Sequence, residues 1–165
     1  MTLSYRLWEN EHFVIKQCRD CAIPGYLMVS HRKSVHLEEL DEKAACALGP
    51  TLVLAVSVIR TVVQPIRVYC AQFGEEATQR HFHILPRTSA TTAEYLIARP
   101  EQGEMIHGPM LLDWARARYR GSELLLQEIK LIERIRTALN CPAQEALAED
   151  PCSHFFGRPR RDYDS

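Results

Sequence analysis

The chain has 165 residues, of which 46% are hydrophobic and 25% charged, and its formal net charge is −1. This length favours one compact domain with an added element, and the composition is that of a globular protein that can bury a core. The near-neutral charge excludes a broadly basic nucleic-acid binder, because binding dominated by phosphates needs an excess of Lys and Arg. No extended nucleic acid is therefore expected as a partner.

The N-terminus carries charge within its first ten positions and lacks the layout of a secretory signal. The most apolar stretch, residues 48–63, is short and is interrupted by Gly49, Pro50 and Arg60, so we expect a core helix and no membrane partner. A cytoplasmic protein follows as the default. Its six cysteines are accordingly expected to be reduced thiols.

Short β-favouring runs separated by polar turns predict five strands, at residues 6–8, 13–16, 26–30, 66–73 and 80–85. Pro86 is expected to stop the last of them. Between the third and fourth strands, helical spacing predicts one long helix with Asp41 as N-cap, which Pro50 kinks or divides in two. This order predicts an α+β fold with a five-stranded, largely antiparallel sheet and one long helix packed on it.

The pattern changes to helices after the last strand. Weak periodicity predicts a loop over residues 88–108, and a helix follows over 109–119 and ends at Gly121. Ser122 is expected to cap a second helix that runs to Leu139. We therefore divide the chain into an α+β unit at 1–90 and a helical C-terminal extension at 91–165, which packs on the same domain and ends in a mobile tail.

The segment that carries chemistry is residues 79–87, with the sequence QRHFHILPR. Strand residues two apart share a face, so Gln79, His81 and His83 line one face and Arg80, Phe82 and Ile84 line the other. Phe82 and Ile84 can pack on the helix. A neutral imidazole is a competent nucleophile near pH 7, and a neighbouring imidazole can donate to phosphate oxygens. On spacing alone, the two histidines could equally form a two-ligand metal face or be two surface residues.

This segment resembles the signature of the histidine triad family, in which histidines alternate with apolar residues before Pro-Arg. Upstream, residues 7–15 resemble the family's opening hairpin, residues 24–29 its Pro-Gly-His strand, and residues 31–41 the passage into its main helix. The resemblance runs from about residue 5 to residue 88 in the family's order. Because Gln79 stands in place of the first motif histidine, the chain is similar to a bacterial-type branch with Gln-x-His-x-His.

The resemblance implies a role for each motif residue. His81 matches the nucleophile that attacks the α-phosphorus of a nucleotide and becomes nucleotidylated, and His83 matches the histidine that contacts the phosphate. Gln79 could hold the His81 region or donate to phosphate, but an amide cannot act as a general acid. Further candidates for phosphate binding lie beside the motif: Gln72, Gly74 and Thr78. Ordinary turn roles are the alternative for these three.

A structural zinc is not expected. Family members with zinc use an N-terminal CxxC, a histidine after the Pro-Gly strand, and the first motif histidine. Here the last two positions hold Ser34 and Gln79, and the pair Cys18-x-x-Cys21 lies in a different place. The sequence therefore predicts two loop thiols at Cys18 and Cys21 rather than half of a zinc site.

The predicted function is a nucleotide-phosphate hydrolase or nucleotidyl transferase, with hydrolysis preferred. Its expected substrates are dinucleoside polyphosphates, such as diadenosine tetraphosphate, or nucleoside phosphoramidates. No cofactor is required, although a divalent cation can accompany a polyphosphate substrate. The resemblance also implies a homodimer. Two alternatives stay open, namely an inactive nucleotide-binding module of the same fold and a metal-binding protein that uses His81 and His83.

Overall fold

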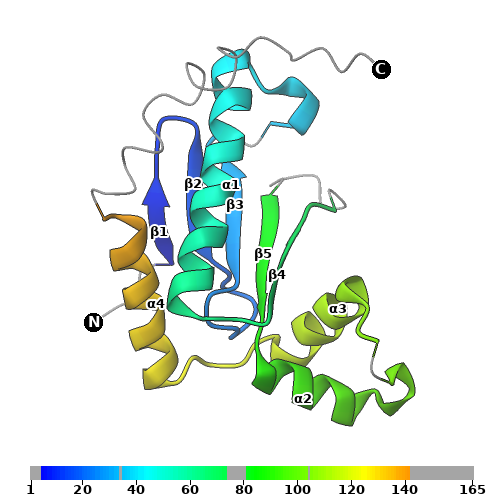
Figure 1. Ribbon diagram of the computed structural model, residues 1–165. Coiled ribbons are helices and arrows are strands. Elements are labelled where there is room, and N and C mark those ends of the chain that lie inside the picture. The colour runs from blue at the N-terminus through cyan, green and yellow to red at the C-terminus, as the bar shows by residue number, and fades with distance from the viewer. Residues whose placement is uncertain (1–4, 34, 74–80, 104, 142–165) are drawn as a thin grey trace, which may run out of the picture.

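The computed structural model describes residues 5–33, 35–73, 81–103 and 105–141. Its centre is a five-stranded antiparallel sheet in the order β1-β2-β3-β5-β4, with one long helix lying across it (Figure 1). The strands are β1 (Arg6–Glu9), β2 (Phe13–Gln17), β3 (Leu27–His31), β4 (Arg67–Ala71) and β5 (His81–Arg87). With the helices that follow, this confirms the expected α+β fold.

The long helix, α1 (Glu42–Val62), follows a short 3-10 turn, η1 (Leu37–Glu39). As expected, Asp41 is the N-cap, and its side chain accepts a hydrogen bond of 2.8 Å from the backbone N–H of Ala44. The helix continues through Pro50, so this proline does not start a second helix. By length and composition α1 could cross a membrane. Four of its residues, Leu54, Ala55, Val58 and Ile59, belong to the main core, so one face of this helix packs on the sheet.

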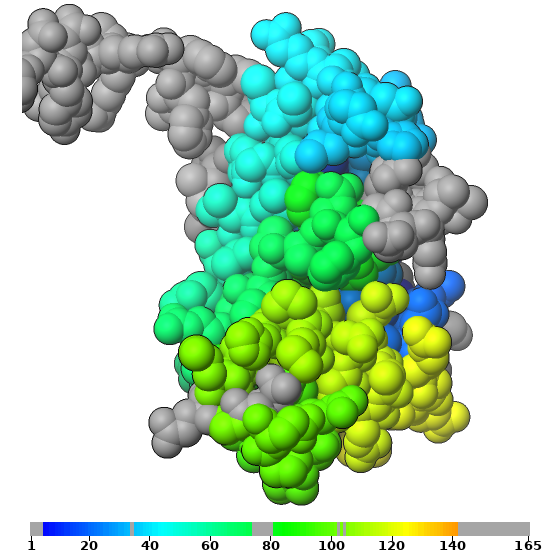
Figure 2. Space-filling view, turned by 90° about the vertical axis from the view of Figure 1, so that its right-hand side faces the viewer, coloured from blue at the N-terminus to red at the C-terminus, as the bar shows by residue number. Residues whose placement is uncertain are grey.

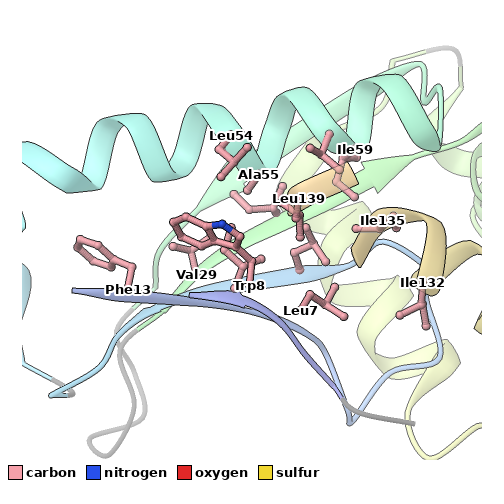
Figure 3. Packing of buried hydrophobic residues seen from close by; sticks show 14 residues of the cluster. Leu7, Trp8, Phe13, Val29, Leu54, Ala55, Ile59, Ile132, Ile135 and Leu139 are labelled. Atoms are coloured by element: carbon pink, nitrogen blue, oxygen red, sulfur yellow. The ribbon is translucent and has the colours of Figure 1, made fainter. Parts of the chain in front are cut away.

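The main core fills the space between α1 and the sheet (Figure 3). Alternate residues of the strands point toward the helix, and α4 (Leu126–Leu139) adds a third wall. The core residues labelled in Figure 3 are Leu7, Trp8, Phe13, Val29, Leu54, Ala55, Ile59, Ile132, Ile135 and Leu139. Burial of this apolar surface is the main force that holds the helices to the sheet.

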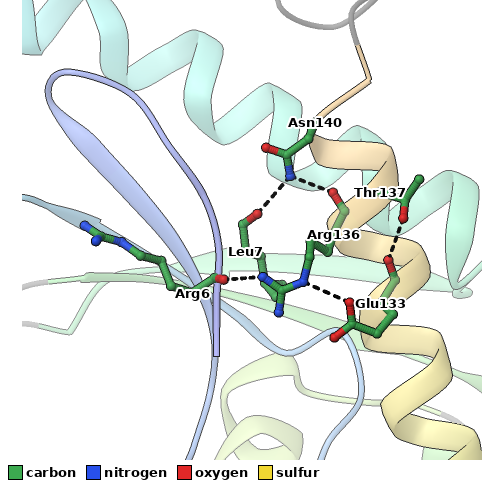
Figure 4. Close-up of polar contacts among 6 residues, drawn as sticks. All are labelled: Arg6, Leu7, Glu133, Arg136, Thr137 and Asn140. Atoms are coloured by element: carbon green, nitrogen blue, oxygen red, sulfur yellow. Dashed lines mark hydrogen bonds and ion pairs between the residues drawn. The ribbon is translucent and has the colours of Figure 1, made fainter. Parts of the chain in front are cut away.

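Polar contacts fix α4 beside β1 (Figure 4). The Arg136 guanidinium donates to the carbonyl of Arg6 at 2.6 Å, and the Asn140 amide donates to the carbonyl of Leu7 at 2.9 Å.

The predicted start of this helix, α4, at Ser122 is wrong. The N-cap is Leu125, because the Ser122 backbone is engaged in the turn that follows the preceding helix.

The predicted loop over residues 88–108 is also wrong. It contains α2 (Ser89–Ala98), capped by the side chain of Thr88, and the 3-10 turn η2 (Pro100–Gln102). Thr91 and Tyr95 are the buried residues of α2, so contacts with other parts of the chain stabilise this helix. Because so few of its positions are buried, its sequence shows little helical periodicity. The next helix, α3 (Gly108–Tyr119), confirms the prediction for that segment.

Together α2 and α3 form a second cluster with residues of the sheet face opposite α1. Tyr26, Tyr69 and Leu85 lie in this cluster, whereas their strand neighbours Val68 and Ile84 lie in the main core. The face opposite α1 is thus partly covered by helices from the C-terminal part of the chain.

Pro86 does not stop β5, because the strand includes it and ends at Arg87. The carbonyl of Arg87 accepts a hydrogen bond from the N–H of Ile66, on the β4 side of the strand. Backbone groups of consecutive strand residues point to opposite sides, so the nitrogen of Pro86 faces the β3 side. There the pairing with β3 ends at Ile84, and no ladder hydrogen bond is lost.

Four described cysteines are free, namely Cys18, Cys21, Cys70 and Cys141. Cys46 is disulfide-bonded, which corrects the expectation of reduced thiols at that position. The tail predicted to be mobile lies outside the described residues. The division at residue 90 stays a prediction.

Candidate functional site

His81 and His83 lie side by side on the sheet face opposite α1. Their rings have centroids 4.4 Å apart and meet edge to face at 73°. The intervening Phe82 packs against the main core, as does Ile84 on the other side of His83. The alternation of the strand therefore places both imidazoles on one face, as the sequence predicts.

The two rings differ in burial. His81 is half-buried, whereas only 7% of His83 is exposed. Two aromatic rings flank it: Tyr26, stacked at 5.8 Å, and Phe73, tilted at 5.7 Å. Neither contact can be read from the local pattern of β5, because both partners come from other parts of the chain.

The contact with Tyr26 is also polar. The Tyr26 hydroxyl lies 2.7 Å from Nδ1 of His83, and both side chains are buried. Burial first, and then the nearby Cys18, raise the pKa of the Tyr26 hydroxyl above its usual range, so the group stays protonated at neutral pH. The sequence analysis assigned Tyr26 no role. The available signal was its position, where the family's Pro-Gly-His has histidine.

Burial is also the main reason why His83 is neutral. It lowers the pKa of the His83 imidazole to about 4, with further contributions from His81 and Arg116. Arg116 belongs to α3, beyond the part of the chain that the family resemblance covers. The positive charge of Arg116 disfavours the protonated form of His83. Sequence reasoning missed Arg116, because nothing local relates α3 to β5.

Of the remaining predicted site residues, the structure describes Gln72. Gln72 lines a small apolar hollow with Phe82, on the face of the sheet opposite His83, with room for about one water molecule. Three candidates, Gly74, Thr78 and Gln79, lie outside the described residues. Phosphate binding by these four residues stays a prediction.

In the part of the chain that the structure describes, no group of three or more His, Cys, Asp or Glu side chains could hold a metal ion. Cys18 and Cys21 are buried neighbours, and the Cys21 Sγ contacts the carbonyl oxygen of Arg116 at 3.7 Å. Burial first, and then Cys18, raise the pKa of the Cys21 thiol to about 11, which disfavours the thiolate that binds zinc. The expectation of no zinc here remains to be tested.

The sequence matches no protein-family model and no curated protein. Solved structures are similar. A Hit-like protein involved in cell-cycle regulation from Bartonella henselae has 18% identity and a TM-score of 0.54, covering 82% of this chain and 86% of that chain. A hypothetical histidine triad nucleotide-binding protein from Sulfolobus tokodaii has 17% identity and a TM-score of 0.55, covering 82% and 83%.

A third solved structure, a zinc-bound histidine triad family protein from Mycobacterium smegmatis, has 15% identity and a TM-score of 0.52, covering 90% of each chain. The chain has an α+β fold with a five-stranded antiparallel sheet, and its paired histidines lie on the sheet face opposite α1. More specifically, the chain has the fold of the histidine triad proteins, as the motif in β5 predicts.

Proposed function

We propose that the chain is a nucleotide-binding protein of the histidine triad type, which hydrolyses or transfers a nucleotidyl group through a covalent intermediate on His81. The observation that carries this proposal is the pair of adjacent imidazoles on the open sheet face, one half-buried and one held neutral. A half-buried ring can reach a substrate. A neutral neighbouring imidazole can donate a hydrogen bond to a phosphate oxygen without repelling a divalent cation that accompanies the substrate.

The reaction runs in two displacements. A ring nitrogen of His81 attacks the α-phosphorus, a P–N bond forms, and the bond to the leaving group breaks. In hydrolysis, water then attacks the same phosphorus, a P–O bond forms as the P–N bond to His81 breaks, and a proton of the water passes to solvent. Transfer replaces water by another acceptor. His83 and the positive charge of Arg116 stabilise the negative charge that builds up on the phosphate oxygens.

The replacement of the first motif histidine by Gln79 bears on the choice of substrate. An amide cannot protonate a leaving group. A polyphosphate departs as an anion and needs no proton, whereas the amine of a phosphoramidate must be protonated to leave. We therefore propose dinucleoside polyphosphates as the preferred substrates, with any divalent cation brought by the substrate.

Single-turnover kinetics with a radiolabelled dinucleoside polyphosphate test this function. Early quenching should trap a protein-bound nucleotidyl group in the wild type and none in His81→Ala, whereas Gln79→Ala should only slow the reaction. The matched control is His31→Ala, which removes a histidine of the neighbouring strand that lines the hollow on the other face. Equal activity in wild type and His81→Ala would refute the covalent mechanism. Binding without turnover in the wild type would favour the inactive nucleotide-binding module.

We also propose a homodimer that pairs along the edge of the sheet. β4 is the last strand of the sheet on one side, and it lies at the surface between α1 and α3 (Figure 2). An edge strand offers backbone groups that another strand can pair with, and exposed Ile66 and Phe73 flank β4. Light scattering coupled to gel filtration should give twice the mass of the chain, and a monomeric mass would overturn this proposal.

A further inference from the structure

The Tyr26–His83 pair joins a residue before β3 to the middle of β5. Tyr26 is fully buried, and its hydroxyl lies 2.7 Å from the His83 Nδ1. Among the described residues, the His83 Nδ1 is the one hydrogen-bond partner of the Tyr26 hydroxyl. Buried hydroxyl groups in proteins are nearly always satisfied, so the direction of this bond decides where the imidazole carries its proton.

The donor in this bond is the tyrosine. If Nδ1 donated instead, the hydrogen of the Tyr26 hydroxyl would have no acceptor among the described residues, in a site closed to water. The unsatisfied hydroxyl would make the tautomer with a donating Nδ1 less populated than the other by on the order of tenfold or more. A neutral imidazole with an accepting Nδ1 carries its proton on Nε2.

The second nitrogen, Nε2, remains available. It has no hydrogen-bond partner among the described residues. The buried side-chain atoms of these residues that lack a partner are Arg87 Nε and the Tyr95 hydroxyl, and the Nε2 of His83 is not among them. Nε2 therefore still reaches the surface of the protein, on the face that it shares with His81. There it can meet a ligand.

The backbone that carries Tyr26 is held in place by a buried amide. Gln17 is fully buried, donates to the carbonyl of Ile23 at 2.7 Å and accepts from the N–H of Gly25 at 3.1 Å. Gly25 has φ +78, and a Cβ there would lie 3.0 Å from a methyl group of Val63. This braced turn leaves the Tyr26 ring little freedom to move away from His83.

We propose that Tyr26 is a positioning residue, which fixes His83 as the Nε2–H tautomer so that His83 offers a phosphate oxygen an N–H and no lone pair. The two adjacent histidines thereby differ in role. His83 is a hydrogen-bond donor and cannot compete as a nucleophile or metal ligand through Nε2, whereas the Tyr26 hydroxyl imposes no such tautomer on His81. Only the identity of the ligand rests on the proposed function, since the tautomer is a property of the protein without ligand.

Nitrogen NMR of protein labelled at histidine tests this role directly. The shifts of the two ring nitrogens distinguish a protonated from an unprotonated atom, and His83→Gln assigns the signals of His83. At pH 7 the wild type should show a protonated Nε2 and an unprotonated Nδ1. In Tyr26→Phe, which keeps the ring and removes the hydroxyl, the Nδ1–H tautomer should become populated.

Tyr95→Phe is the matched control, because it removes a second buried hydroxyl, in the same cluster, that makes no hydrogen bond to the described residues. It should leave the signals of His83 unchanged. A protonated Nδ1 in the wild type, or an unchanged tautomer in Tyr26→Phe, would overturn the proposal. If Tyr26→Phe does not fold, the wild-type spectrum alone decides.

Binding of AMP separates this proposal from the proposed function. The Kd of AMP should rise on the order of tenfold in Tyr26→Phe, as expected for loss of one hydrogen bond to a charged group, and should not change in Tyr95→Phe. If the tautomer is as proposed but the wild type binds neither AMP nor a dinucleoside polyphosphate, the proposed function fails and the role of Tyr26 stands. If the wild type binds AMP tightly but carries a protonated Nδ1, the role of Tyr26 fails and nucleotide binding stands.

Discussion

The burial of His83 predicts a specific loss of stability in mild acid. The pKa of its imidazole is lowered from 6.5 to about 4, so between these values the folded protein binds fewer protons than the unfolded chain. The stabilisation from His83 is therefore fully present above about pH 6.5 and is lost as the pH falls toward 4. Wild type should lose about 2 kcal/mol by pH 5 and about 3 kcal/mol by pH 4 from this group alone.

His83→Gln removes the titrating group and keeps a polar side chain facing Tyr26. Urea unfolding at pH 7 and at pH 5 gives the free energy of unfolding of both proteins. The variant is expected to be less stable at pH 7, because it loses the buried ring contacts. Its loss between pH 7 and pH 5 should be smaller than that of the wild type by about 2 kcal/mol.

His107→Gln is the control, since it removes an exposed histidine at the start of α3 and should follow the wild-type dependence on pH. Parallel losses in wild type and His83→Gln would show that burial does not hold this ring neutral. The reasoning about the site would then be wrong, because a charged His83 could not accept a hydrogen bond from Tyr26.

Three further predictions concern the scaffold and the thiols. Ile135→Ala, in the core between α4 and α1, should lower the free energy of unfolding by roughly 2–5 kcal/mol in urea, whereas Leu126→Ala, at an exposed position of the same helix, should change it little. Asp41→Ala should lower it by about 1 kcal/mol, because the N–H of Ala44 loses its cap, and Asp41→Asn should restore most of the loss. Freshly purified protein should hold no stoichiometric zinc, and metal that disappears in Cys18→Ser would contradict this expectation.

The sequence by itself determined what depends on neighbours along the chain. The alternation in β5 placed His81 and His83 on one face, because strand side chains alternate with a period of two whatever packs on them. Asp41 marked the start of α1 because capping is a local hydrogen bond. The motif and its upstream spacing also predicted the fold that the solved structures share.

Tertiary structure decided what depends on residues far apart in the sequence. Tyr26 meets His83 across 57 positions, because the pairing of β3 with β5 brings them together. α2 forms although its sequence has little periodicity, since its buried contacts are with other elements. The neutrality of His83 likewise comes from burial, and burial requires the folded chain. A local pattern can place a side chain on a face, but only packing sets its partners and its proton.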